Sequence, residues 1–190
     1  MITTKLVKKI GELSNFSSAE FDLFLSCARQ REMAKRELLL REGDVCNDLY
    51  FVEEGYLRAH TDRDGKEVSI RFTFEGEFTS NIKSLKLQQP SVYSITAGEP
   101  ALVTLFDKDA LLKQYFHSPA IEALCMRVLG FMYMDEAEQH SLHQRYTPAQ
   151  RYHHLLRHKP GMVQRVPVMH LSSYLGITRE ALSRIRARKK

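Results

Sequence analysis

The stretch LLLREGDVCNDLYFVEEGYLRAH, residues 38–60, contains short runs of apolar residues separated by turns at Gly43 and Gly55. Similar runs continue to about residue 106, with further turns at residues 62–65, 75–76 and 98–100. Short strands that recur about every 12 residues are typical of an antiparallel roll or barrel, because a parallel sheet needs long crossover connections. Residues 31–106 are therefore predicted to form an antiparallel β-roll.

Helical spacing flanks this region on both sides. Residues 3–30 carry apolar residues three or four apart, which predicts small N-terminal helices. Ser118 followed by Pro119 is a typical helix start, and the apolar spacing continues to about residue 143. The apolar stripe of this long helix is wide enough for its own domain and for a second helix, so we expect it to pair with another copy of the chain. Packing inside the monomer is the alternative. The expected dimer contacts are Ile121, Leu124, Val128 and Phe131.

The last quarter of the chain is strongly basic. Residues 145–190 carry 11 Lys and Arg but one acid, Glu180, whereas residues 1–144 carry 17 basic and 22 acidic residues. A basic region on an acidic body is typical of a module that binds a polyanion, because Lys and Arg release the counterions of the phosphates. Double-stranded DNA is the expected partner, and a solvated basic tail is the alternative.

A helix-turn-helix is predicted within this basic region. Gly176 supplies the left-handed conformation that a tight turn requires, and Thr178 can cap the helix that follows. On that last helix, an inward set is predicted at Ala181, Leu182 and Ile185, and an outward set at Arg179, Glu180, Ser183, Arg184 and Ala187.

The outward set suits the recognition of base edges. Arg donates two hydrogen bonds to guanine, and Glu accepts one from cytosine. A local ion pair between Glu180 and Arg184 is the alternative reason for the carboxylate. Arg186 and Arg188, with the final lysines, are expected to contact phosphates. The predicted DNA-binding residues are Thr178, Arg179, Glu180, Ser183, Arg184, Arg186 and Arg188.

Together these segments resemble the Crp/Fnr family of bacterial transcription regulators over nearly the whole chain. Residues 38–60 are similar to the family's cyclic-nucleotide-type β-roll, and GEF at residues 76–78 is similar to the start of its ligand-binding cassette. LGITREALSRIR, residues 175–186, is similar to its recognition helix. The resemblance implies that Arg179, Glu180 and Arg184 read bases.

The resemblance also implies an α+β fold with three parts. An N-terminal antiparallel β-roll of the cyclic-nucleotide-binding, jelly-roll type with flanking helices, residues 1–117, would sense an effector. A long dimerisation helix would follow at residues 118–144, and a C-terminal winged helix-turn-helix at residues 145–190 would bind DNA. Because the chain stops four residues after Arg186, the wing is expected to be reduced or missing.

The effector cassette departs from the pattern of the cyclic-AMP-binding members. Those members place a Glu and, about ten residues later, an Arg where counting without gaps finds Asn81 and Ser91. Without that Arg a cyclic phosphate loses its bidentate charged partner, so control by cyclic AMP is not expected. Substitution by Lys83 or Lys86 is the alternative. The expected effector pocket consists of Gly76, Glu77, Phe78, Asn81, Ser91 and Tyr93.

Other classes of function lack support in the sequence. Cys27, Cys46 and Cys125 are far apart, match neither an iron–sulfur nor a zinc pattern, and are expected to be reduced and buried. The strand region offers His60 as its one histidine, so no metal site, haem, cofactor or enzyme active site is predicted. The longest central apolar run, residues 128–134, is too short for a membrane span, and the N-terminus lacks the apolar centre of a secretion signal.

The sequence therefore predicts a cytoplasmic, homodimeric, sequence-specific transcription regulator that binds a palindromic DNA site. A small-molecule effector and RNA polymerase are expected as further partners, and a membrane is not. The alternative is a small-molecule-binding β-roll sensor whose helix-turn-helix is an interaction element or a vestige.

Overall fold

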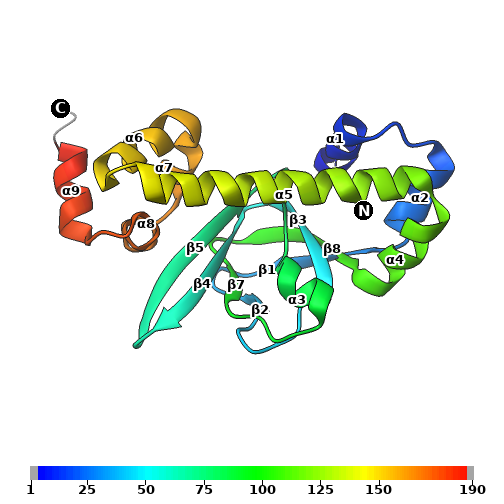
Figure 1. Cartoon of the computed structure of the whole chain (residues 1–190), viewed down its shortest axis with the longest axis horizontal. Coiled ribbons are helices and arrows are strands. Elements are labelled where there is room, and N and C mark those ends of the chain that lie inside the picture. Colours follow the sequence, from blue (N-terminus) through cyan, green and yellow to red (C-terminus); the bar gives the residue numbers. More distant parts are fainter. Residues whose placement is uncertain (1–3, 188–190) are drawn as a thin grey trace.

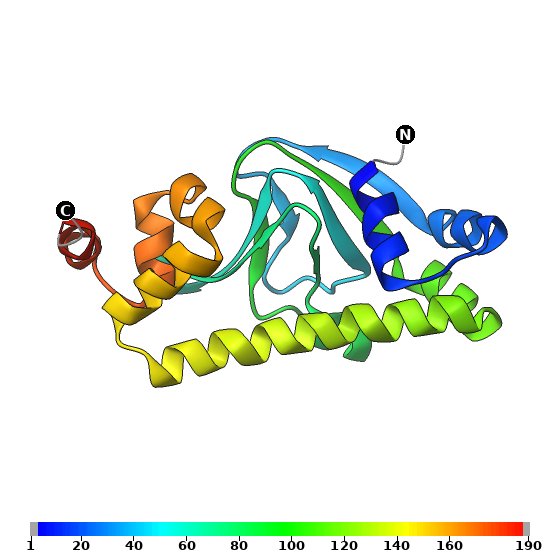
Figure 2. The same cartoon turned by 90° about the horizontal axis from the view of Figure 1, so that it is seen from above.

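One long helix, α5 (Pro119–Arg145), runs along the molecule in the computed structural model, which describes residues 4–187 (Figure 1). A β-roll lies against the middle of this helix. Seen from above, the N-terminal helices lie at one end of α5 and the C-terminal helices at the other (Figure 2). Every other part of the fold is therefore arranged along α5.

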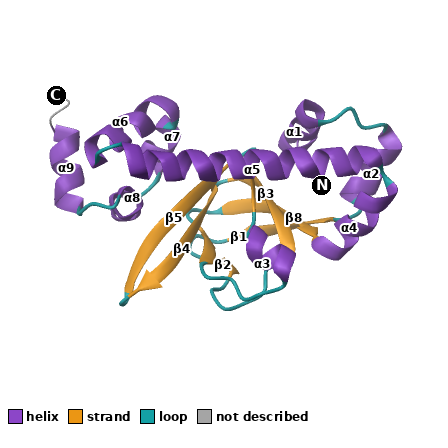
Figure 3. Cartoon of the chain, viewed as in Figure 1, coloured by secondary structure: helices purple, strands orange, loops and turns teal. Residues whose placement is uncertain are grey.

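Two antiparallel sheets of four strands form the roll (Figure 3). The first, in the order β1-β8-β3-β6, contains β1 (Ala28–Met33), β3 (Asp48–Glu54), β6 (Phe78–Thr79) and β8 (Ala101–Asp107). The second, in the order β2-β7-β4-β5, contains β2 (Leu38–Leu40), β4 (Tyr56–Arg63), β5 (Lys66–Phe74) and β7 (Ser94–Ala97). Side chains of both sheets share one core. The predicted antiparallel β-roll is confirmed.

The turn between β3 and β4 requires glycine at position 55. Gly55 has a φ of 77°, and a Cβ added there would lie 2.5 Å from the carbonyl oxygen of Pro100 and 2.9 Å from the Cα of Ala101. Both neighbours belong to the backbone where β8 begins. Position 55 therefore combines an unfavourable dihedral angle with a close approach of two chain segments.

Gly55→Ala is expected to lower the free energy of unfolding by about 2–5 kcal/mol. A left-handed conformation costs an L-residue about 1–2 kcal/mol, and overpacking against backbone costs about 1–3 kcal/mol more. Urea denaturation measures the loss. Gly43→Ala is the matched control, because Gly43 also has a positive φ, of 93°, but its added Cβ meets nothing within 4 Å. Equal losses in the two variants would contradict the importance of the contact with residues 100–101.

The first half of α5 packs with three helices of the N-terminal part. These are α1 (Thr4–Leu13), α2 (Ser18–Leu25) and α4 (Lys108–His117). Leu6, Ile10 and Phe24 form a common core with the inner side of α5. The Arg127 guanidinium of α5 also donates a hydrogen bond to the carbonyl oxygen of Leu13. The predicted N-terminal helices are thus present and fixed to α5.

The predicted dimer contacts on α5 need correction. Ile121, Leu124 and Val128 are 0%, 1% and 3% exposed, because they belong to the core shared with α1 and α2. Side chains buried in their own chain are not available to a second copy, so three of the four assignments are wrong. Phe131, at 56%, is exposed. The outer surface of α5 carries a different apolar set, which includes Met126, Leu129 and Tyr133.

The C-terminal helices pack on the roll as well as on each other. They are α6 (Pro148–His158), α7 (Pro160–Arg165), α8 (Val168–Leu175) and α9 (Arg179–Ala187). Their core joins Tyr152, Leu155 and Leu182 to Tyr56 and Phe72 of the roll. The sequence pattern does not predict α7, which begins at Pro160 and buries Met162. The basic C-terminal part is therefore docked against the roll.

Two further observations complete the fold. Of the three cysteines, Cys27 and Cys46 are buried as expected, whereas Cys125 is only half-buried. Among residues 4–187, none of the helices combines the length and the apolar character needed to cross a membrane. Arg188, Lys189 and Lys190 lie outside the described residues, so the expected phosphate contacts there and the reduced or missing wing stay predictions.

Candidate nucleic-acid interface and effector cavities

The turn between α8 and α9 has the geometry that the sequence predicts. Gly176 adopts a φ of 68°, and its N–H donates to the carbonyl oxygens of Ser172 and Ser173. The N–H of Ile177 also donates to Ser172, at 3.0 Å. The hydroxyl of Thr178 then accepts the N–H of Ala181 at 3.2 Å, which caps α9. Glycine ends the first helix and threonine starts the second.

The two sides of α9 differ in burial and in charge. Leu182 is fully buried, while Ala181 and Ile185 are half-buried. The polar side is solvent-exposed and includes Thr178, Arg179, Glu180, Ser183 and Arg184. Leu182 therefore anchors α9, and the side of α9 that is predicted to read bases is exposed to solvent.

Glu180 and Arg184 form no ion pair among the salt bridges of residues 4–187, which argues against that pair as the reason for the carboxylate. The pKa of Glu180 is lowered mainly because its own backbone N–H and the Thr178 side chain hydrogen-bond to it. The carboxylate is thus held ionised at the start of α9, where it can accept hydrogen bonds from a partner.

Arg186 lies elsewhere than expected. Its guanidinium sits over the ring of Tyr152, 5.8 Å from the ring centroid, and its Nε is buried. This half-buried position packs α9 on α6 rather than extending toward solvent. Arg186 is therefore part of the support of α9, at least through its side-chain stem.

Arg165 holds α7 on the roll through a clamp. The Arg165 guanidinium donates to both carboxylate oxygens of Glu75, at 2.9 and 2.8 Å, and also pairs with Glu99. It lies over the rings of Tyr56 and Phe74, 5.7 and 5.2 Å from their centroids. Hydrogen bonds to Glu75 and then Glu99 raise the pKa of Arg165. The clamp is therefore insensitive to deprotonation of the arginine.

A second polar cluster docks α8 on the β4–β5 hairpin. The Ser173 hydroxyl accepts the N–H of Ser69 at 2.9 Å and donates to the carbonyl oxygen of Glu67 at 3.3 Å. Arg58, a buried residue of β4, donates to the Ser69 hydroxyl at 2.9 Å and to the Glu67 carboxylate at 2.6 Å. Half-buried His170 of α8 faces this cluster, and burial followed by the charge of Arg58 lowers its pKa to about 4.

The free energy of unfolding is expected to fall as pH decreases from about 6.5 toward 4. In the unfolded chain His170 takes up a proton near its ordinary value of 6.5, but in the folded chain only at about 4. Between these values the unfolded state binds more protons, so acid favours unfolding. The pKa of His60 is lowered in the same way, mainly by burial, and adds an effect of the same sign.

Urea denaturation between about pH 7 and 5 measures this change, and the hydrogen bond from Arg58 lowers the pKa of Glu67, so that carboxylate stays ionised over the range. His170→Gln should make the free energy of unfolding depend less on pH. His117→Gln changes an exposed histidine of α4 and should leave that dependence unaltered. An unchanged slope in His170→Gln would show that the docking of α8 does not depend on neutral His170.

The two cassette positions that depart from the cyclic-AMP-binding pattern bind each other. The Asn81 Nδ2 donates to the Ser91 hydroxyl at 2.7 Å, and that hydroxyl donates to the carbonyl oxygen of Tyr93 at 2.6 Å. Asn81 Oδ1 accepts the N–H of Ser84 at 3.1 Å, at the start of α3 (Ile82–Leu87). Asn81 and Ser91 are both buried. Their polar atoms are thus satisfied inside the protein and offer no cationic cradle for a phosphate.

The predicted effector residues line two cavities rather than one pocket. Gly76, Glu77 and Phe78 line a cavity of about 220 Å³ between α1, β5 and α5. Asn81 and Tyr93 line a larger one of about 550 Å³ between β5, α3 and α5. Ser91 lines neither of these two. The prediction of a single pocket is therefore corrected.

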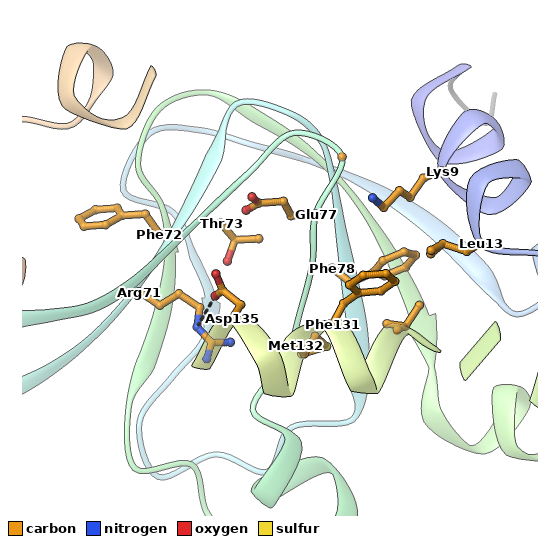
Figure 4. Close-up of a pocket in the computed structure, with 12 residues that line it drawn as sticks. Lys9, Leu13, Arg71, Phe72, Thr73, Glu77, Phe78, Phe131, Met132 and Asp135 are labelled. Atoms are coloured by element: carbon orange, nitrogen blue, oxygen red, sulfur yellow. Dashed lines mark ion pairs between the residues drawn. The ribbon is translucent and has the colours of Figure 1, made fainter. Parts of the chain in front are cut away.

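Figure 4 shows the smaller cavity, in which charged groups face one another across an apolar floor. Lys9 points in from α1 and Glu77 from the roll, while Phe78, Phe131 and Met132 lie below them. The N–H of Phe74 donates to the Glu77 carboxylate at 2.8 Å. Phe131, which is also a predicted dimer contact, lines this cavity.

The larger cavity has mostly apolar walls with a basic rim. Leu129, Met132 and Tyr133 of α5 form one wall, and Ile70 of β5 lies opposite. Three cations, Arg71, Lys83 and Lys86, and one carboxylate, Glu136, also line it. Arg71 lines both cavities. Sequence reasoning missed Arg71, although a cation between apolar residues in SIRFTF, residues 69–74, was the available signal.

Comparisons with known proteins give a family for the roll and a fold for the chain. Residues 30–118 match the model of the cyclic nucleotide-binding domain. The structure of FixK2 from Bradyrhizobium japonicum is similar, with a TM-score of 0.71 and 19% identity over 85% of this chain and 83% of that chain. The c-di-GMP responsive global regulator CLP of Xanthomonas campestris has a TM-score of 0.69 and 19% identity over 90% and 91% of the two chains.

The Catabolite Activator Protein of Thermus thermophilus is similar at a TM-score of 0.52 and 20% identity, over 92% of this chain and 84% of that chain. No curated protein matches the sequence. Residues 30–118 are thus similar to the cyclic nucleotide-binding domain, and the chain as a whole is Crp/Fnr-like in fold.

Proposed function

We propose that this protein is a sequence-specific DNA-binding transcription regulator of the Crp/Fnr type, and not an enzyme. The observation that carries the proposal is the polar side of α9, where Arg179, Glu180 and Arg184 are exposed to solvent while Leu182 anchors the helix. A helix of this kind enters the major groove and reads base edges with side chains near its N-terminus. The net positive charge of residues 145–190 supports the same partner.

The regulator acts as a homodimer through the outer side of α5. Met126, Leu129 and Tyr133 are 58%, 40% and 74% exposed and follow one another at spacings of three and four residues. This spacing places them on one side of the helix, as in the seam of a coiled coil. We name these three residues the α5 seam, and two of them, Leu129 and Tyr133, also line the larger cavity. They replace Ile121, Leu124 and Val128 as the contacts with the second copy.

Each of the three parts of the chain has its own role in this proposal. Residues 1–117 sense an effector, residues 118–144 dimerise and residues 145–190 bind DNA in the cytoplasm, with RNA polymerase as the next partner. The hydrogen bond between Asn81 and Ser91 supports control by something other than cyclic AMP, because neither residue supplies a charged donor to a phosphate. Two copies of α9 about 34 Å apart would favour a palindromic site.

Selection from a pool of random DNA duplexes tests the proposal. The expected result is enrichment of an inverted repeat whose half-sites are about one helical turn apart. Binding to that repeat should weaken steeply with salt, because phosphate contacts release counterions. If no sequence is enriched while the protein is folded, the helix-turn-helix is an interaction element and the proposal fails.

A further inference from the structure

The larger cavity has the size and walls of a ligand site. Its volume of about 550 Å³ falls within the range of roughly 300–1,000 Å³ that is usual for small-molecule pockets. Leu129, Met132 and Ile70 give it apolar walls, and Tyr93 lies at the end near the cassette. Burial raises the pKa of Tyr93 to about 12, so its hydroxyl is neutral and donates to the carbonyl oxygen of Ser80 at 3.2 Å. An apolar body fits these walls.

Arg71 is the best placed charge for a ligand. Its side chain is only 15% exposed, yet its nearest carboxylate oxygens, on Asp135 and Glu136, are 3.9 and 3.7 Å away. Charge-assisted hydrogen bonds are about 2.7–2.9 Å long, so both pairs are loose. The Nε of Arg71 is buried and has no hydrogen-bond partner among the described residues. A largely buried guanidinium with an unused donor is suited to a bidentate anion.

Two lysines extend the positive charge to the rim. Lys83 and Lys86 are exposed residues of α3 that line the cavity. Neither has a carboxylate within ion-pair distance in the described part of the chain. With Glu136 as the one carboxylate that lines the cavity, the lining is cationic. An incoming anion therefore meets attraction at the mouth and a fixed donor inside.

We propose that the larger cavity binds a small organic anion with an apolar body, anchored by Arg71 and guided by Lys83 and Lys86. The proposal names the effector class of the regulator proposed above, and it depends on that function only for its consequence in gene control. The anion takes its place beside Arg71 and α5. Asn81 also lines the cavity, but its amide is bound to Ser91, so the ligand need not contain a cyclic phosphate. An organic carboxylate or sulfonate has the required chemistry.

Arg71 also connects this cavity to the C-terminal helices. Asp135, its partner on α5 (Figure 4), accepts a hydrogen bond from Lys159 at 3.1 Å, immediately before α7. A ligand that binds the Arg71 guanidinium competes with Asp135 for it. A ligand in the cavity can therefore change the contact between Asp135 and Lys159, and Lys159 belongs to the DNA-binding part.

Two fluorescent probes test the ligand class in the full chain. The first, 1-anilinonaphthalene-8-sulfonate, is an anion with an apolar body, and the second, N-phenyl-1-naphthylamine, has the same body without the sulfonate. We expect the anion to bind saturably, at one site per chain, and about tenfold more tightly than the neutral probe, because only the anion pairs with Arg71. Equal affinities, or no saturable binding of the anion, would overturn the proposal.

Variants separate recognition of the anion from general apolar binding. Arg71→Gln should remove most of the preference for the anion. Lys83→Gln with Lys86→Gln should reduce it about threefold or more. Because both lysines are exposed, this double variant folds even if Arg71→Gln does not. Lys35→Gln is the control, since Lys35 is an exposed lysine that lines neither cavity. A loss in Lys35→Gln equal to that of the double variant would contradict the site.

DNA binding is measured separately on the same proteins. A preference for the anion without selective DNA binding would leave the ligand site standing and refute the proposed function. Selective DNA binding without any preference for the anion would support the proposed function and refute the ligand site. The two proposals can therefore fail independently.

Discussion

Arg184→Ala is expected to weaken binding to the selected DNA repeat by at least about 30-fold. A bidentate contact between Arg and guanine contributes about 1–3 kcal/mol, and a dimer makes that contact twice, so the loss is about 2–6 kcal/mol. Arg184 is exposed on α9, and none of the described salt bridges involves it. Its removal should therefore leave the fold intact. Fluorescence anisotropy with the repeat and with a scrambled duplex gives both affinities.

The matched control is Arg157→Ala on α6, another exposed arginine of the basic C-terminal part. It removes the same charge but lies outside α9, so it should weaken binding to both duplexes equally and only slightly. Arg184→Ala should instead bring the affinity for the repeat close to that for the scrambled duplex. If the two variants behave alike, α9 contributes charge but does not read bases.

Met126→Glu with Tyr133→Glu is expected to convert the dimer to monomers and to weaken binding to the repeat by about 100-fold or more. Two glutamates per chain would place four like charges in an apolar seam, where each buried and unpaired charge costs several kcal/mol. Both residues are more than half exposed in the single chain, so its own core is unaffected. Sedimentation velocity reports the oligomeric state, and anisotropy reports the DNA affinity of the same samples.

Val7→Glu is the control for this variant, because Val7 is an exposed apolar residue of α1 outside the α5 seam. It should leave the dimer unchanged. A dimer that persists in the double variant would show that the two copies meet elsewhere. A chain that is monomeric before any substitution would contradict the homodimer altogether.

The β-roll and the helix-turn-helix could be predicted because their signals are local. Gly55 and Gly176 mark turns that require positive φ, and the apolar runs between such turns have the length of strands or helices. The cap at Thr178 and the anchoring role of Leu182 follow from positions within one helix. Each of these features depends on residues fewer than ten positions apart, which is the range that a sequence pattern describes.

The role of each side of α5 could not be predicted in the same way. Apolar residues lie all around this helix, so its periodicity predicts two stripes but does not say which one faces the protein's own core. Val128 is buried because α1 and α2 return across that side, whereas Tyr133 is left exposed. That choice depends on tertiary packing, and it reversed the assignment of the dimer contacts.

The effector cavities and the docking of α7 could not be predicted from the sequence, for a related reason. Arg71 and Asp135 meet because α5 crosses β5, although 64 positions separate them. Arg165 reaches Glu75 across 90 positions. Nothing in the local pattern of either residue indicates its partner. The departure at Asn81 and Ser91 could be seen from the sequence, but their mutual hydrogen bond could not.

Methylation interference on the selected DNA repeat tests the central claim most directly. Methyl groups at guanine N7 lie in the major groove, at the atom that the Arg184 guanidinium would contact. The account predicts interference at guanines in two major grooves, about one helical turn apart on the same face of the duplex, and loss of that interference in Arg184→Ala. Interference that is absent, confined to one groove or unchanged in Arg184→Ala would contradict base reading by paired α9 helices.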